Sequence, residues 1–217
     1  MAIATQPVLS NSLSTLGLTA KTLFFSLNFD FTPPKTEKKK KNRFKQNQGA
    51  IDIDIACVLY DEQCTIVDMV WFKQLRDSAE SVRHQGDSLN GKDRGEQALY
   101  NAPLDQEQIR LYLKDIPAQV TSIGLLANSY YEQPLRRVHA GEIHLSDDEG
   151  NRAFDINLKQ LPADCHTLWV ASLHREVGDW HLILQNLPLP AKDLEKAAQD
   201  VAHELARALP VPLSVAT

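Results

Sequence analysis

The chain has 217 residues, of which 43% are hydrophobic and 24% are charged, so it can form one large folded domain or a domain with an appendage. Its apolar runs fall short of the roughly 20 residues that cross a bilayer, which argues against a membrane-spanning protein. The net charge of −5 conceals one basic run, Lys35–Lys45, within an otherwise acidic chain, and this distribution argues against a general nucleic-acid binder.

The N-terminus and the cysteines indicate a cytoplasmic protein. The segment before Lys21 is rich in Ser and Thr and lacks the basic start of a secretory signal peptide. The three cysteines form an odd set without metal-binding spacing, so we expect three buried, reduced thiols at Cys57, Cys64 and Cys165.

The first predicted strand is the aromatic-rich segment Lys21–Phe31. Pro33 and Pro34 end this strand, because proline removes a backbone donor and restricts its neighbour. The basic run comes next, and we expect residues 35–48 to form an exposed loop insertion.

The second predicted strand starts at about Ile51 and is apolar on both faces after two acids. Alternate residues from Ile51 to Leu59 share one face, and Asp52, Asp54, Ala56, Val58 and Tyr60 share the other. A turn at residues 61–63 leads to a third strand, Ile66–Phe72. Residues 73–104 show little periodicity but many polar side chains and glycines, which is typical of a functional or mobile loop.

The rest of the chain predicts short strands and one helix. The spacing of strands without intervening helices is typical of a β-sandwich. The predicted strands are Ile109–Leu113, Thr121–Leu126, Glu142–Leu145, Ala153–Leu158, Thr167–Leu173 and Trp180–Gln185, with hairpin turns at residues 146–151 and at Gly178-Asp179.

The C-terminal segment predicts an amphipathic helix that begins after Asp193. Its apolar stripe consists of Leu194, Ala198, Val201, Leu205 and Ala208. The stripe can pack on the sandwich or bind a partner protein. We therefore predict a mainly β, two-sheet sandwich over residues 1–187 and a helix and tail over residues 188–217.

The acidic strand and the polar loop after it form a candidate calcium site. Asp52 and Asp54 lie about 7 Å apart on one strand face, and calcium prefers six to eight oxygen ligands. Their alternative is a solvated strand start that binds nothing. The candidate ligands are Asp52, Asp54, Asp87, Asn90, Asp93 and Glu96, with Ser88 as a further oxygen donor.

Catalysis is the weaker hypothesis for the same residues. A pair of carboxylates can act as general acid and base, but no nucleophile motif, phosphate-binding glycine loop or dinucleotide fingerprint accompanies them. In the hairpin at Gly178-Asp179, His181 would face Glu176, which favours a cross-strand pair over a zinc site.

The basic run has two interpretations. It can be a solvated loop, or it can contact an anionic membrane surface through Lys38, Lys39, Lys40 and Lys41. It lacks the interleaved aromatic residues that stack on bases.

Several motifs, in order along the chain, resemble the TerD family of tellurium-resistance and general stress proteins. They extend over roughly residues 20–186. The acidic strand Asp52–Asp61 is similar to the family's Asp-x-Asp-Ala-Ser-Ala strand, although Ala-Ser is absent. The other matching segments are Val70–Phe72, His84–Gly91, Asp115–Ala118, Glu142–Leu158 and Glu176–His181.

The resemblance implies a β-sandwich that holds calcium between the acidic strand and the glycine loop. It also implies a non-enzymatic, cytoplasmic role with other proteins of a stress-response assembly, partly at a membrane. This chain has Lys92 and Arg94 where the family loop is acidic, and Lys73 where the family commonly has Asn. Cations oppose a dication, so we expect calcium binding to be weakened or lost.

Overall fold

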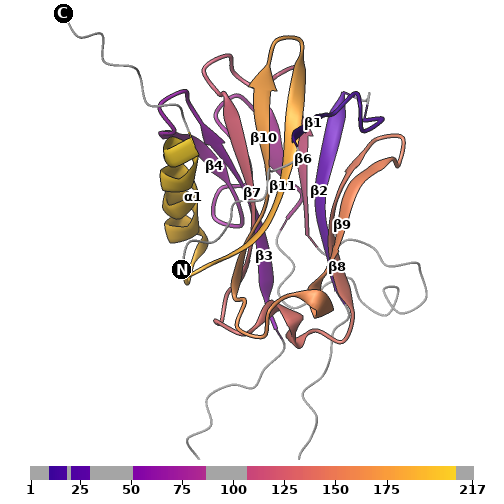
Figure 1. Ribbon diagram of the computed structural model, residues 1–217, viewed down its shortest axis with the longest axis vertical. Coiled ribbons are helices and arrows are strands. Elements are labelled where there is room, and N and C mark those ends of the chain that lie inside the picture. Colours follow the sequence, from indigo (N-terminus) through magenta and orange to yellow (C-terminus); the bar gives the residue numbers. More distant parts are fainter. Residues whose placement is uncertain (1–9, 19–20, 30–50, 87–106, 209–217) are drawn as a thin grey trace, which may run out of the picture.

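The computed structural model describes residues 10–18, 21–29, 51–86 and 107–208, which fold into two facing antiparallel sheets (Figure 1). The six-stranded sheet has the order β1 (Ser10–Ser12), β11 (Asp179–Leu189), β10 (Thr167–Glu176), β7 (Ser122–Ser129), β3 (Ile53–Tyr60) and β4 (Ile66–Val70). The five-stranded sheet has the order β5 (Val82–His84), β6 (Glu107–Tyr112), β2 (Thr22–Phe29), β8 (Gly141–Asp147) and β9 (Arg152–Asn157).

Apolar side chains from the two inner faces fill the space between the sheets. Ile53 and Ile55 of β3 are buried in one cluster with Phe25 of β2, Ile109 of β6 and Leu125 of β7. Fully burying one such side chain contributes roughly 1.5–3 kcal/mol. The predicted two-sheet sandwich is therefore confirmed, and the even-numbered residues of β3 must face the other way.

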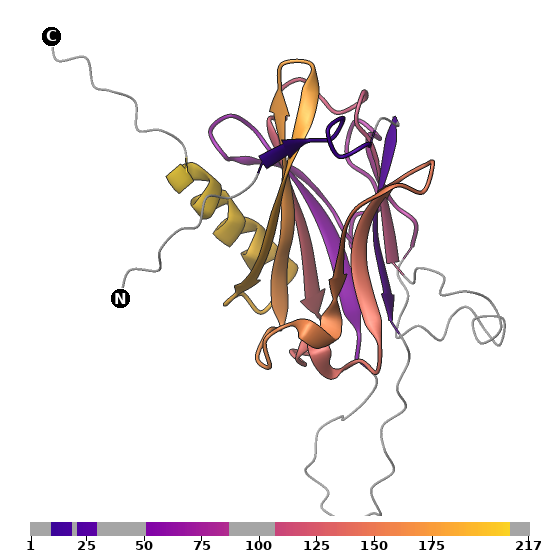
Figure 2. The same cartoon turned by 45° about the vertical axis from the view of Figure 1, so that its right-hand side comes forward.

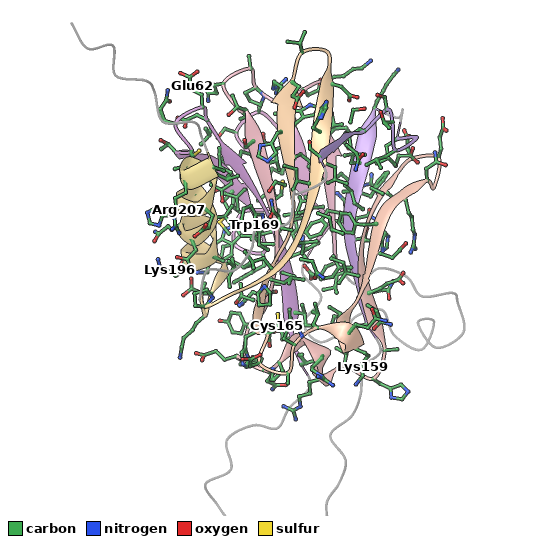
Figure 3. The ribbon with its side chains drawn as sticks, viewed as in Figure 1. Glu62, Lys159, Cys165, Trp169, Lys196 and Arg207 are labelled. Carbon is green, nitrogen blue, oxygen red and sulfur yellow. The ribbon has the colours of Figure 1, made fainter. Side chains whose placement is uncertain are left out.

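The helix α1 (Leu194–Ala208) covers the outer face of the six-stranded sheet (Figure 2). Asp193 caps it, because the backbone N–H of Lys196 donates to the Asp193 Oδ1 at 2.7 Å. Trp169 lies toward the sandwich from the helix in Figure 3, whereas Lys196 and Arg207 extend outward. The residues buried together at this interface are Ala56, Val58, Tyr60, Leu126, Trp169, Leu194, Ala197, Ala198, Val201 and Leu205.

Gly124 lets the helix approach the sheet closely. A Cβ atom at this position would lie 3.2 Å from Tyr60 Cε2 and 3.4 Å from Val201 Cγ1. The Tyr60 hydroxyl donates to the Ala198 carbonyl at 2.9 Å, which ties β3 to the middle of α1. Among the described residues no helix has the length and apolar character needed to cross a bilayer.

The predicted strands are all found, but β4 ends at Val70, before the predicted Phe72, and several others extend beyond their predicted ends. For example, β11 continues to Leu189, past the predicted end at Gln185. Two short strands, β1 and β5, were not predicted, because three residues carry too little periodicity and both pair only at sheet edges. In the helix, Ala208 is exposed and Ala197 is buried instead, which corrects the predicted stripe by one position.

The turn between β8 and β9 is organised by one buried carboxylate. The backbone N–H groups of Glu149 and Asn151 donate to Asp147 Oδ1, and the Asn151 side chain donates to Oδ2. Burial disfavours the charged form, but these hydrogen bonds outweigh it and lower the pKa of Asp147. The ionised carboxylate therefore stabilises the folded hairpin.

We expect Asp147→Asn to lower the free energy of unfolding by about 1–2 kcal/mol at pH 7. Because the folded-state pKa lies below the unfolded value near 4, the wild-type advantage is present above that value and disappears as the pH falls through the folded pKa. Urea unfolding from pH 7 to pH 2.5 measures the difference. Asp148→Asn, an exposed acid of the same turn, is the matched control. An equal loss at every pH would contradict this role.

We expect Tyr60→Phe to cost about 1 kcal/mol, because it removes a buried hydrogen bond to α1 without changing the ring. Urea denaturation of wild type and variant measures the loss. The control is Tyr130→Phe, at a tyrosine that is exposed. If both variants unfold at the same urea concentration as wild type, the hydroxyl does not anchor the helix.

Candidate functional site

Asp52 and Asp54 lie at the start of β3, on the outer face of the six-stranded sheet. Asp54 is the second residue of β3, so the alternation of the strand puts it on the same side as Ala56, Val58 and Tyr60, and Asp52 directly precedes the strand. Asp52 and Asp54 are only 6% and 3% exposed, so the alternative of a solvated strand start is wrong. Two carboxylates buried on one face are costly unless positive charge or hydrogen-bond donors balance them.

A row of polar side chains leads from Asp54 to the start of α1. Asp54 pairs in register with Asn128 of β7, which pairs in register with Thr167 of β10. The Asn128 side-chain amide donates to Thr167 Oγ1 at 2.7 Å and to the Lys192 carbonyl at 3.3 Å. Thr167 Oγ1 in turn donates to the Ala191 carbonyl at 2.7 Å. The acidic end of β3 is thus connected to the segment that leads into the helix.

Aromatic rings lie beside this acidic end. The backbone N–H of Tyr130 donates to the Asp52 carbonyl, and its ring packs edge-on against Phe72 with centroids 5.8 Å apart. Lys73 Nζ lies 4.5 Å from the centre of the Trp71 ring and 3.7 Å from a carboxylate oxygen of Glu195. The Lys73 ammonium group therefore contacts both the Trp71 ring and the Glu195 carboxylate in the first turn of α1.

The remaining predicted calcium ligands fall outside the described residues. These are the loop oxygens Asp87, Ser88, Asn90, Asp93 and Glu96. The cations Lys92 and Arg94, and the basic run with Lys38–Lys41, fall outside them as well. The structure therefore describes two of the six predicted ligands, Asp52 and Asp54, and does not test whether the loop joins them.

Both ends of that loop meet at a buried contact between His84 and Glu107. His84 ends β5 and Glu107 begins β6, and His84 Nε2 lies 2.9 Å from Glu107 Oε2 with side chains 0% and 1% exposed. At this distance the imidazole and the carboxylate are in direct polar contact. The backbone N–H of Gly86 donates to His84 Nδ1 at 3.1 Å, so the other ring nitrogen is also engaged. Sequence patterns could not reveal this pair, because 22 intervening residues separate its members.

A second cluster of ligand-type side chains lies on the outer face of the five-stranded sheet. Glu142 and His144 of β8 and Asp155 of β9 place their ligand atoms within 4.8 Å of one another, so they could hold a metal ion. Arg152 already donates to Glu142 Oε1 and Asp155 Oδ1, and Asn28 donates to Glu142 Oε1 as well. Although burial acts in the opposite direction, the Arg152 and Asn28 bonds lower the pKa of Glu142. A metal would have to displace Arg152.

The predicted hairpin at Gly178-Asp179 is confirmed, but His181 does not face Glu176 as predicted, and the two side chains meet diagonally across the strands. His181 Nε2 lies 3.3 Å from Glu176 Oε2, while the residue opposite His181 in register is His174. Burial lowers the pKa of His174. The nearby His181 lowers it further, whereas Glu176 acts in the opposite direction. His174 Nδ1 also lies 3.0 Å from Ser122 Oγ, so a hydroxyl occupies one ring nitrogen.

The three cysteines are buried and free, as predicted. Burial raises the pKa of Cys57, and the nearby Asp77 adds to this effect. Burial and Asp164 raise the pKa of Cys165 to about 11. Both thiols are therefore protonated at neutral pH and are poor nucleophiles and metal ligands.

Comparison with known proteins assigns this arrangement to a family. The TerD domain model matches residues 12–185, which is most of the chain. The tellurium resistance protein TerZ of Serratia marcescens is 26% identical over 197 residues, covering 90% of this chain and 95% of that protein.

Two solved structures share the fold. A Streptomyces coelicolor homologue of the telluride resistance protein TerD superposes with a TM-score of 0.65 at 13% identity, covering 84% of this chain and 98% of its own. A protein of unknown function superposes with the same TM-score and identity, covering 82% of this chain and 95% of its own. At this identity the likeness shows the fold alone.

We expect His84→Leu to cost about 3–5 kcal/mol in the free energy of unfolding, because it leaves the Glu107 carboxylate buried without the imidazole. The double variant His84→Leu/Glu107→Leu should recover much of this loss, since it removes both polar groups. Urea denaturation at pH 7 compares them, with the exposed His139→Leu as control. A loss below about 1 kcal/mol in the single variant would show that the His84–Glu107 contact does not hold the base of the loop.

Proposed function

Because the chain belongs to the TerD domain family, we propose that this tellurium-resistance-type protein works as a weak calcium-binding stress protein without catalytic activity. The observation that supports calcium most directly is the burial of Asp52 and Asp54 on one face of β3. Neighbouring carboxylates repel each other when both are ionised, and a divalent cation that binds both reduces that repulsion. Carboxylate oxygens are also the ligands that calcium prefers.

The proposed site needs ligands beyond these two. The following loop would contribute Asp87, Asn90, Asp93 and Glu96 as further oxygen donors. Lys92 and Arg94 in the same loop add positive charge, which lowers calcium affinity toward the millimolar range of weak protein sites. Lys73 contributes less to this weakening than the sequence suggested, because its ammonium group is held by Trp71 and Glu195.

We propose that the protein acts in the cytoplasm with other proteins of a stress-response assembly. The apolar face of α1 is used for packing on the sheet, so a partner would meet its polar face. Contact with an anionic membrane through Lys38, Lys39, Lys40 and Lys41 is the alternative binding role, and it rests on charge alone.

Calcium should raise the thermal stability of the protein by mass action. For a dissociation constant near 1 mM, 10 mM calcium adds about 1.4 kcal/mol. For a chain of this size, that corresponds to a rise of roughly 3–6 °C in Tm. We expect Asp54→Asn to abolish the rise and Lys92→Gln/Arg94→Gln to enlarge it. Differential scanning calorimetry with calcium, with magnesium and with chelator measures the change.

The matched control for this experiment is Asp155→Asn, which removes one acid from the Glu142–His144–Asp155 cluster. If calcium stabilises Asp54→Asn as much as wild type and fails to stabilise Asp155→Asn, the ion binds at that cluster and not at β3. If 10 mM calcium shifts none of the proteins, the chain does not bind calcium at this affinity.

A further inference from the structure

A cavity of about 760 Å³ opens at one end of the sandwich, away from Asp52 and Asp54. The register Tyr60–Ser122–His174 marks this end, whereas Asp54–Asn128–Thr167 marks the other. The walls come from three connections: the segment after β1, the segment after β6 and the β10–β11 hairpin. A volume of this size is typical of sites for small organic molecules.

The inner wall of the cavity is apolar and is part of the packed core. Leu13, Leu18 and Trp180 line it and are themselves buried in the main core, and Leu113 packs against the same core. The Arg175 guanidinium stacks over the Trp180 ring with 4.5 Å between its Cζ and the ring centre. Such a wall suits an apolar or aromatic body.

The charged groups around the cavity differ in how they are balanced. Its two acids have partners: Asp179 accepts from the Ser14 hydroxyl at 2.7 Å and from the Ser14 N–H at 3.2 Å, and Glu176 pairs with His181. The hydrogen bonds of Arg175 go to the carbonyls of Ile116, Pro117 and Val120, which carry no net charge.

Two lysines complete the lining. Lys21 and Lys114 are exposed, and within the described part of the chain neither forms an ion pair. Together with Arg175 they give the cavity three cations against the two acids Glu176 and Asp179, an excess of one positive charge. The cavity therefore attracts negative charge, although the whole chain carries a net charge of −5.

From this combination we propose that the cavity binds a small organic anion with an apolar body. The apolar part packs against Leu113 and Trp180, and the anionic group lies between Lys21 and Lys114. The class includes aromatic sulfonates and amphiphilic carboxylates, whose shared chemistry is one anionic group on an apolar frame. This site shares no residue with the proposed calcium site, so the two proposals stand or fall separately.

The test uses two fluorescent probes of nearly the same shape. The anionic probe is 8-anilinonaphthalene-1-sulfonate, and the neutral probe is N-phenyl-1-naphthylamine. We expect saturable binding of the sulfonate to the full chain at one site. The double variant Lys21→Gln/Lys114→Gln should weaken the sulfonate about tenfold and the neutral probe less than about twofold.

The matched control is Lys192→Gln/Lys196→Gln, which removes the same charge from lysines that pair with Glu132 and Asp200 near α1. It should leave sulfonate binding unchanged. Leu113→Trp, which puts a larger side chain in the apolar wall of the cavity, should weaken both probes. Each variant is used only where its thermal unfolding remains cooperative, and Lys21→Gln and Lys114→Gln alone replace the double variant if it does not fold.

Three results would overturn the proposal. The first is the absence of saturable sulfonate binding to the wild-type chain. The second is an equal loss of sulfonate binding in the two lysine double variants, which would indicate a general charge effect. The third is unchanged binding of both probes in Leu113→Trp, which would place the probe elsewhere on the surface.

Discussion

The need to bury both faces of β3 determines much of this structure. One face, with Ile53 and Ile55, enters the core between the sheets, and the other, with Ala56, Val58 and Tyr60, would be an exposed apolar surface without a cover. The helix α1 provides that cover. The helix can approach because β7 has no side chain at Gly124, where Tyr60 and Val201 converge. The sandwich and the helix α1 are therefore packed together as one unit.

The two acids at the start of β3 belong to the same outer face and are buried as well. The outer face on which they lie continues under α1, and the Asn128–Thr167 row joins it to the segment before the helix. A strand that is apolar on both faces could place charge only at its ends. Asp52 and Asp54 occupy one end, and at the other the chain turns through Asp61, whose Oδ1 accepts from the backbone N–H groups of Gln63 and Thr65.

Periodicity was sufficient to predict the long strands, the sandwich and the helix, because each has enough residues for a repeat to show. It also placed Asp52 and Asp54 on the correct face of β3. It failed for β1 and β5, whose three residues carry no repeat and whose existence depends on a longer neighbour. Features made by distant segments were equally invisible: the His84–Glu107 pair and the cavity beside Trp180 arise only when the chain has folded. The Glu142–His144–Asp155 cluster was easier to predict, because the register of the β8–β9 hairpin brings its members together.

The length of β3 has an electrostatic consequence. Its eight residues span about 23–26 Å, since each residue of a strand adds about 3.3 Å. The Debye length at physiological ionic strength is about 8 Å, so surface charges at one end are screened from those at the other. The acidic start of β3 and the lysines that line the cavity at the other end can therefore coexist without neutralising each other. A charge substitution at one end of β3 should therefore have little effect on the electrostatic potential at the other end. The acids at the start of β3 and the lysines of the cavity can thus vary independently.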